Sequence, residues 1–301
     1  MSSPTPESDA GPGGGLRHGS GDGRRHGRRD GAARRSESGR GVSGRLPWVL
    51  VVPAVLGLVF LVLPLAGLLV RAPWSTLLER LAEPQVLEAL RLSLVTATVA
   101  TVLCLVLGVP LAWLLARVEF PGRRVVRALV TVPLVLPPVV GGVALLLVLG
   151  RRGLVGQWLE AGFGVTLPFT TAGVVVAEAF VAMPFLVISV EGALRAADRR
   201  FEEAAATLGA SRWTVFRRVT LPMVMPGVVA GAVLCWARAL GEFGATITFA
   251  GNFPGTTRTM PLAVYLALET EPEAAIVLSL VLLAVSVVIL ASLRDRWVSA
   301  P

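Results

Sequence analysis

The sequence predicts an all-α polytopic membrane protein with six transmembrane helices and a helical loop on the cytoplasmic side. Hydrophobic residues make up 54% of its 301 residues, and the mean hydropathy is +0.71, a balance that favours lipid over a water-soluble core. Six apolar stretches are near or above the ~20 residues that a bilayer requires. Because lipid offers the backbone no hydrogen-bond partners, we expect these stretches to be helices.

The first 46 residues differ in composition from the rest of the chain: they are rich in Gly, Ser, Arg and Pro and nearly free of large apolar side chains until Leu46. Such a segment buries too little apolar surface to fold, so residues 1–46 are expected to form a disordered basic cytoplasmic tail. Its arginine pairs suggest a twin-arginine export signal, but the apolar run that follows is too long for a signal peptide. Residues 47–301 are expected to form the membrane domain.

The six spans are predicted, in chain order, at 48–70, 92–116, 125–149, 171–190, 223–249 and 274–293. Pro133 and Pro137-Pro138, with Gly141-Gly142, should break the third span, and Met183-Pro184 should kink the fourth. Broken helices at mid-depth are tolerated where the backbone lines a cavity or is buried in protein. The third, fourth and fifth spans are therefore predicted to line a pathway.

Positive charge predicts the orientation, since short loops rich in basic residues stay in the cytoplasm. All 28 basic residues are arginine. A cytoplasmic N-terminus places 21 of them in the inner segments and 6 in the outer loops, with Arg238 inside a span. Both termini, and the loop between the fourth and fifth spans, are therefore predicted to be cytoplasmic.

That loop, about residues 191–222, is amphipathic in two parts. The apolar side chains of the first part are Phe201, Ala204, Ala205 and Leu208, and those of the second are Trp213, Phe216 and Val219, beside Arg212, Arg217 and Arg218. Between them Gly209 can take a positive φ, so residues 203–222 are predicted to fold back as two short helices, here called the knob. Pro222 suits the opening of the next span. The competing interpretation is a helix lying on the membrane surface.

The knob carries Glu203-Ala204-Ala205, three residues, Gly209, nine residues, Val219, one residue and Leu221-Pro222. This spacing resembles the EAA loop of the permease subunits of binding-protein-dependent ABC importers, although the family usually has Ile at the position of Val219. The resemblance implies that the knob docks into a groove of a cytoplasmic ATPase and transmits its movement to the membrane helices. The ATPase-coupling residues so implied are Glu203, Ala204, Ala205, Gly209, Leu221 and Pro222.

Ionisable residues inside the membrane mark the candidate pathway. Arg238 and Glu242 lie four residues apart in the fifth span and can pair, and Glu178 lies midway along the fourth. Charges at this depth are costly, about 2.5 to 3.5 kcal/mol each on insertion scales, and so require a partner or water. Gly241 and Gly244 flank Glu242 and would let the helix bend or another backbone approach. An equally weighted alternative is that the pair only stabilises the packing of the helices and has no role in a pathway.

The stretch Gly244-Ala245-Thr246-Ile247-Thr248-Phe249, with the loop Pro254-Gly255-x-Thr257-Arg258-Thr259-x-Pro261-Leu262-Ala263-x-Tyr265, resembles the molybdate and tungstate branch of the sulfate and molybdate permeases. The resemblance covers about residues 50–297. Gly244 and Thr246 are therefore placed with Arg238, Glu242 and Glu178 on the translocation pathway. Gly255, Thr257 and Arg258 fall in an outward loop where a solute-binding protein would land.

The resemblance implies a homodimer of permease chains with two ATP-binding subunits and an extracytoplasmic oxyanion-binding protein, importing molybdate by alternating access. Tungstate or sulfate is the alternative substrate. This chain is expected to bind no cofactor or metal, with ATP and Mg on the partner ATPase, because no phosphate loop or catalytic motif is visible in it. An ion-coupled carrier would use Glu178 and Glu242 as coupling carboxylates, but it would leave the knob unexplained.

Overall fold

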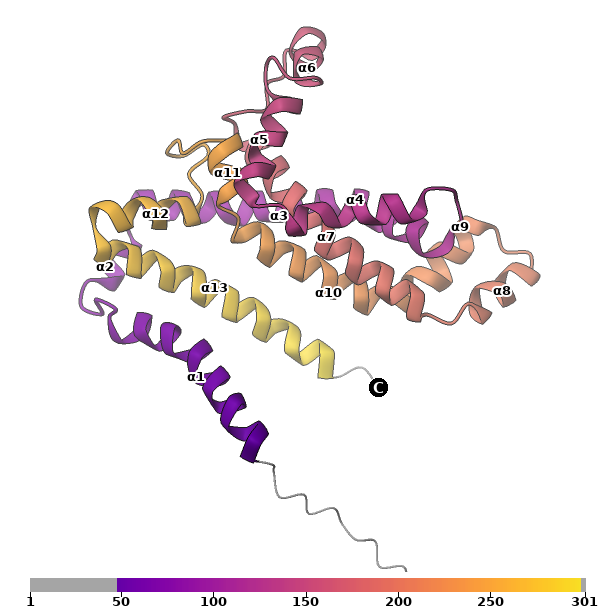
Figure 1. Ribbon diagram of the computed structural model, residues 1–301, viewed down its shortest axis with the longest axis horizontal. Helices are drawn as coiled ribbons and strands as arrows, with labels where there is room; N and C mark the ends of the chain where they lie inside the picture. Colours follow the sequence, from indigo (N-terminus) through magenta and orange to yellow (C-terminus); the bar gives the residue numbers. More distant parts are fainter. Residues whose placement is uncertain (1–47, 299–301) are drawn as a thin grey trace, which may run out of the picture. The chain divides into compact units, whose positions relative to one another are not determined.

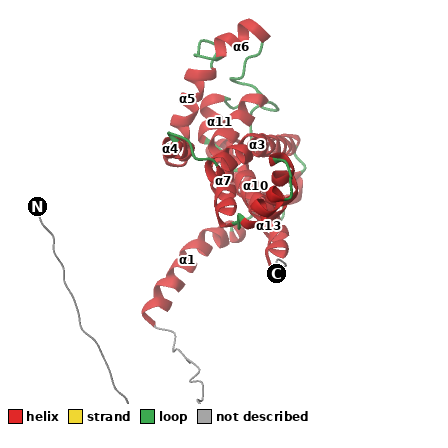
Figure 2. Cartoon of the chain, turned by 90° about the vertical axis from the view of Figure 1, so that its right-hand side faces the viewer, coloured by secondary structure: helices red, strands yellow, loops and turns green. Residues whose placement is uncertain are grey.

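The computed structural model describes residues 48–298, and every element in that range is helical (Figure 2). The predicted all-α class is therefore confirmed. The chain divides into two units, residues 1–54 and 55–301, and of the first unit only the opening turns of one helix are described. The expected basic tail, residues 1–46, lies outside the described residues.

The elements follow one another along the chain as a series of long and short helices. They are α1 (Trp48–Val70), α2 (Leu77–Leu81), α3 (Pro84–Arg117), α4 (Arg123–Val135), α5 (Pro138–Leu149), α6 (Gly156–Phe163), α7 (Thr171–Ala196), α8 (Arg200–Thr207), α9 (Arg212–Val215), the π-helical turn η1 (Phe216–Thr220), α10 (Leu221–Leu240), α11 (Gly244–Phe249), α12 (Met260–Thr270) and α13 (Pro272–Val298). Within residues 48–298 five helical runs are long and apolar enough to cross a membrane, and the bent pair α4–α5 makes a sixth span if it is counted as one.

The centre of the second unit is built from α3, α7 and α10, which pack on one another (Figure 1). Their contacts use small residues, as is usual where membrane helices approach closely. A Cβ atom at Gly227 would lie 2.3 Å from the Cβ of Ala193, and one at Gly231 would lie 2.9 Å from the Cβ of Ser189. Only glycine therefore permits this separation between α10 and α7.

The predicted break of the third span is confirmed, since α4 and α5 meet at an angle of 119°. Leu136 has an extended backbone, and Pro137 and Pro138 begin α5, because a residue before proline avoids the helical region. The fourth span is not broken in this way, since α7 continues as one helix through Pro184.

The fifth span was wrongly predicted as one helix over 223–249. The structure ends α10 at Leu240 and starts the separate short helix α11 at Gly244. The Glu242 carboxylate accepts a hydrogen bond from the backbone N–H of Ala245 at 2.8 Å, so a side chain satisfies a donor that a continuous helix would have satisfied. The segment between α11 and α13 contains a further helix, α12, which the apolar pattern did not reveal.

Candidate functional site

The knob lies at one end of the α3–α7–α10 bundle, and α2 and α12 lie at the other (Figure 1). Gly209 has φ +84°, so the predicted left-handed turn between α8 and α9 is confirmed. No atom lies within 4 Å of the place where its Cβ would be. Glycine is favoured here by the backbone conformation, and a larger side chain would meet no steric clash.

The second half of the knob differs from the prediction of two separate short helices. α9 passes through η1 directly into α10, and the three together form one helical run over Arg212–Leu240. Pro222 lies in the first turn of α10, as predicted, with Leu221 beside it half-buried. Any displacement of α9 is therefore carried into α10 by a continuous backbone.

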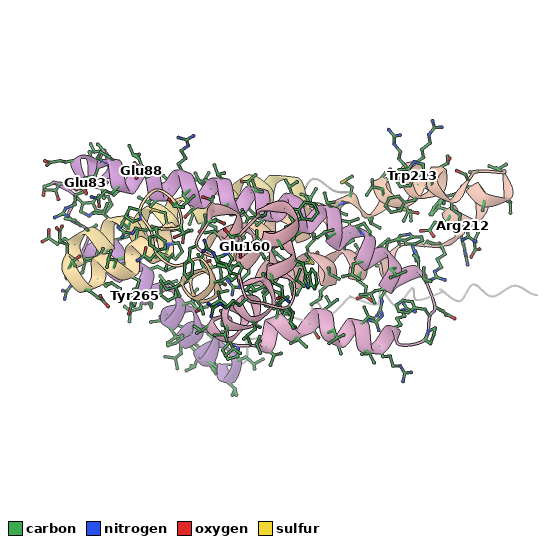
Figure 3. All side chains as sticks on the ribbon, turned by 90° about the horizontal axis from the view of Figure 1, so that it is seen from above. Glu83, Glu88, Glu160, Arg212, Trp213 and Tyr265 are labelled. Carbon is green, nitrogen blue, oxygen red and sulfur yellow. The ribbon has the colours of Figure 1, made fainter. Side chains whose placement is uncertain are left out.

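The surface of the knob combines exposed apolar, acidic and basic side chains. Leu208 is 88% exposed, Trp213 is 68% exposed, and Phe201 is also exposed. Glu203 and Ala204 are exposed and Ala205 is half-buried. Trp213 and Arg212 lie at the end of the molecule opposite Glu83 and Glu88 (Figure 3). Apolar side chains clustered on a protruding element are typical of a surface that another protein covers.

The base of the knob is fixed by an ion pair that the sequence analysis missed. Arg117, the last residue of α3, places Nη2 2.8 Å from Oε1 of Glu202, which directly precedes the knob. The Thr220 hydroxyl, at the end of η1, donates to the same oxygen at 3.0 Å. The one signal in the sequence was a second glutamate beside Glu203, and the motif spacing gave it no role.

Aromatic and cationic side chains hold the same region together. The Phe216 ring stacks on Trp213 at a centroid distance of 5.7 Å and meets Trp113 of α3 edge-on at 6.3 Å. Arg123 donates to the carbonyl oxygens of Leu115 and Ala116 at 2.7 and 3.3 Å. These carbonyls at the end of α3 lack partners within the helix, so a guanidinium is a favourable partner.

The predicted pair of charges in the membrane is present. Arg238 Nη1 lies 2.6 Å from Glu242 Oε2, and the Glu242 side chain is 1% exposed while that of Arg238 is 27% exposed. Arg238 belongs to the last turn of α10, whereas Glu242 lies in the break before α11. The pair therefore fixes the geometry at the point where the fifth span is interrupted.

Glu178 is buried on α7 in the bundle interior. It is 1% exposed, and its helix packs against α11, which begins two residues after Glu242. Its Oε1 accepts from the Thr96 hydroxyl of α3 at 2.9 Å, while its Oε2 has no partner among the described residues. The Thr246 hydroxyl is also buried without a described partner. The structure thus pairs Arg238 with Glu242 and buries Glu178 on a helix that packs against α11.

Gly244 lies at the contact between α11 and α5. A Cβ on Gly244 would lie 2.9 Å from the Cβ of Pro138, and one on Gly142 would lie 2.6 Å from the Cβ of Thr248. The expectation that Gly244 admits another backbone is confirmed. Both halves of this contact depend on glycine.

The three candidate residues of the loop between α11 and α12, Gly255, Thr257 and Arg258, differ in exposure and in hydrogen bonding. Gly255 is exposed at φ +68°. Thr257 is buried, and its hydroxyl accepts from the Phe253 N–H at 2.9 Å, a hydrogen bond that shapes the loop. Arg258 donates to Asn252 at 2.9 Å.

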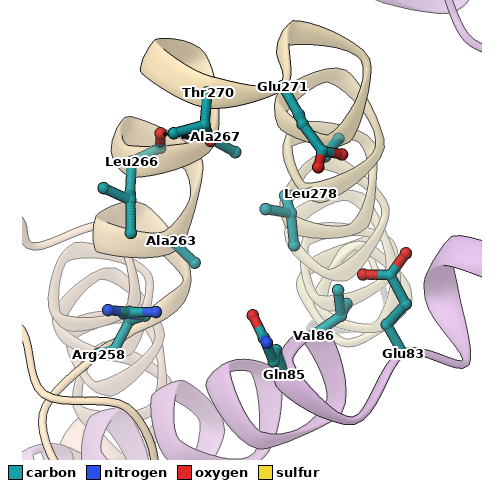
Figure 4. Close-up of a pocket in the computed structure, with 11 residues that line it drawn as sticks. Glu83, Gln85, Val86, Arg258, Ala263, Leu266, Ala267, Thr270, Glu271 and Leu278 are labelled. Atoms are coloured by element: carbon teal, nitrogen blue, oxygen red, sulfur yellow. Dashed lines mark hydrogen bonds between the residues drawn. The ribbon is translucent and has the colours of Figure 1, made fainter.

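Arg258 also lines a cavity of about 160 Å³ between α3, α12 and α13 (Figure 4). Glu83 and Glu271 lie on the opposite wall, so this cavity contains both signs of charge. Glu271 is bonded to Arg80 at 3.0 Å, and this hydrogen bond raises the pKa of Arg80.

Comparison with known proteins identifies the family. Residues 108–300 match the family described as the binding-protein-dependent transport system inner membrane component. The chain belongs to this family. The permease is 50% identical over 251 residues to the molybdenum transport system permease protein ModB of Mycobacterium tuberculosis, covering 83% of this chain and 95% of that protein. It is 39% identical over 238 residues to the sulfate transport system permease protein CysT of Escherichia coli, covering 78% and 86%.

Among solved structures, the permease resembles a chain of a bacterial ABC transporter involved in the import of the acidic polysaccharide alginate. The TM-score is 0.69 at 18% identity, with coverage of 84% of this chain and 96% of that chain. This likeness shows the fold alone. The resemblance to the molybdate permeases, predicted from residues 244–265, is confirmed by the identity to ModB.

Proposed function

We propose that this permease forms the membrane passage of an ATP-driven molybdate importer. The observation that carries the proposal is the 50% identity to a molybdenum transport permease over 83% of the chain. The exposed knob supports an ATPase partner, since it offers apolar and charged side chains at one end of the bundle. A separate ATPase would supply the energy, with ATP and Mg bound there and no cofactor on this chain.

Two copies of the chain would form the passage, each with one knob on one ATP-binding subunit. An extracytoplasmic oxyanion-binding protein would deliver molybdate at the opposite end, near Gly255 and Arg258. Closure of the ATPases would move the knobs and open the passage outward, and hydrolysis would reset it inward. The buried carboxyl groups of Glu178 and Glu242, with Arg238 paired to Glu242, would border the path, because desolvated polar groups at this depth require a functional or packing reason.

Both termini would lie in the cytoplasm. The segments predicted to be cytoplasmic, 117–127 and 191–221, lie together at the knob end of the bundle, and residues 71–91 and 250–273 lie together at the other (Figure 1). For these four segments the grouping supports the charge-based orientation, while the third outer segment, 150–169 with α6, lies apart from α2 and α12 (Figure 1).

The proposal is tested by reconstituting the permease in liposomes with a candidate ATPase and a candidate oxyanion-binding protein from the same organism. We expect ATP-dependent uptake of labelled molybdate, competed by tungstate and weakly by sulfate. Uptake that follows a proton or sodium gradient without ATP would contradict the proposal and favour the ion-coupled carrier. Equal competition by sulfate would assign the permease to the sulfate branch.

A further inference from the structure

The chain connects the knob to two bundle helices only. α8 follows α7, and α9 continues into α10. α3 is distant in the sequence, but it spans 34 residues, from Pro84 to Arg117, which is about 50 Å at 1.5 Å per residue. Its last residue is Arg117, the partner of Glu202.

One carboxylate oxygen joins three elements at this point. Glu202 Oε1, from α8, receives Arg117 Nη2 of α3 at 2.8 Å and the Thr220 hydroxyl of η1 at 3.0 Å. The Arg117 side chain is 7% exposed and that of Glu202 is 19% exposed. Charge-assisted hydrogen bonds away from water are short and strong, and separating such a pair would leave a poorly hydrated charge. The ends of α3, α8 and η1 are therefore constrained to move together.

The other half of α3 reaches the buried polar cluster. Thr96 donates to Glu178 Oε1 at 2.9 Å, and Ser93 accepts from the backbone N–H of Met260, the first residue of α12, at 2.7 Å. α7, which carries Glu178, also packs against α11, which begins two residues after Glu242. A shift of α3 along its axis would therefore change contacts at the cluster and at the start of α12.

We propose that Arg117, Glu202 and Thr220 form a positioning link by which movement of the knob reaches α3, and through α3 the cluster around Glu178. The inference rests on the proposed function of the knob as the ATPase-docking element. It adds that α3, which is not adjacent to the knob in the sequence, receives the movement directly through a side-chain contact. Coupling is reciprocal, so the same link carries the signal of a loaded binding protein back to the ATPase.

The test uses the complete importer in proteoliposomes, with Glu202→Gln, Thr220→Val and the charge swap of Arg117→Glu with Glu202→Arg. Basal ATP hydrolysis, its stimulation by molybdate-loaded binding protein, and molybdate uptake per ATP are measured. We expect Glu202→Gln to keep the ATPase bound and basal hydrolysis intact, while stimulation and uptake per ATP each fall about tenfold, a typical coupling factor. Thr220→Val should give a smaller loss, and the swap should regain part of both.

Glu191→Gln is the matched control. Glu191, like Glu202, has one carboxylate oxygen with two donors, here Arg127 Nη2 at 2.7 Å and Arg195 Nη2 at 2.8 Å, and its side chain is 9% exposed. This cluster joins α4 to α7 and includes no knob residue. Its loss should lower the melting temperature and leave uptake per ATP unchanged. Equal losses of uptake per ATP for Glu191→Gln and Glu202→Gln would reduce the Glu202 cluster to a stabilising contact.

Parental stimulation and uptake per ATP in Glu202→Gln would overturn the link. If this variant does not assemble, Glu202→Asp replaces it, since the shorter side chain cannot reach both partners, and parental values for that variant overturn the link equally. A parent permease that binds no ATPase would instead contradict the proposed function of the knob, so the two failures are distinguishable.

Discussion

Arg238 and Glu242 form one ion pair in unequal surroundings. The carboxylate is buried and also accepts the Ala245 N–H, whereas the guanidinium is partly exposed. Removing Arg238 leaves a buried carboxylate without its cation. Removing the charge of Glu242 leaves an arginine whose long side chain can reach water or a headgroup. The two losses should therefore differ.

We expect Arg238→Met to lower the free energy of unfolding by about 3–5 kcal/mol, the cost of an unpaired buried charge, and Glu242→Gln to cost clearly less. Unfolding in mixed detergent micelles measures both. The double variant Arg238→Met with Glu242→Met should regain stability and ATPase association but transport poorly. Parental transport by the double variant would leave packing as the only role of the pair, and equal losses in the single variants would refute the unequal surroundings.

Gly244 and Gly209 are required for different physical reasons, which substitution separates. Gly244→Ala should cost about 1–3 kcal/mol, since its Cβ would overlap Pro138 of α5 and force the helices apart. Gly209→Asn should cost little, because asparagine accepts a left-handed backbone and the site is open. Thermal unfolding of the purified permease measures both changes. A smaller loss for Gly244→Ala than for Gly209→Asn would contradict the close α5–α11 contact.

At the scale of the element, the apolar pattern predicted the helices that cross the whole bundle but not those that stop within it. α7 begins at Thr171 as predicted, and the break at Pro137-Pro138 was visible because proline restricts the residue before it. The end of α10 was not visible in the sequence. There the Glu242 carboxylate takes the place of a backbone carbonyl as hydrogen-bond acceptor, and hydropathy carries no information on such a bond. Glu202 was missed for a similar reason, since its partner Arg117 is 85 residues away.

The knob provides the prediction at this scale. Glu203→Ala and Gly209→Val should lower molybdate transport severalfold with normal insertion. The first removes an exposed carboxylate of the docking surface, and the second forces a β-branched residue to a positive φ, at about 1–2 kcal/mol. Co-purification with the ATPase and stimulated ATP hydrolysis are the measurements. Normal values in both variants would show that the knob does not dock the ATPase.

At the scale of the whole molecule, the charges of the loops together determine which side of the membrane each end of the bundle faces. Ser211 lies in the knob, and Ser75 and Thr256 lie in the loops at the opposite end of the bundle. All three are exposed, so a cysteine at each position is accessible to a reagent. The native Cys104 and Cys235 are buried in the core and must be replaced first.

In that background an impermeant thiol reagent applied to intact cells should label cysteine at Ser75 and at Thr256, and should label cysteine at Ser211 or Ser36 only after the membrane is opened. Ser36 lies outside the described residues and tests the predicted cytoplasmic tail. Labelling at Ser211 in sealed cells would reverse the orientation and remove the ATPase from the proposal.

The exposed apolar side chains of the knob also bear on the fate of a permease made in excess. Leu208 and Trp213 of the knob, with Phe201 two residues before it, are exposed at one end of the bundle. A copy without its ATPase would present them as an unfolded chain does, and chaperones and proteases act on such surfaces. We expect the half-life of the permease in cells to depend on how much ATPase is synthesised with it, so that subunit stoichiometry is set by degradation of the orphan.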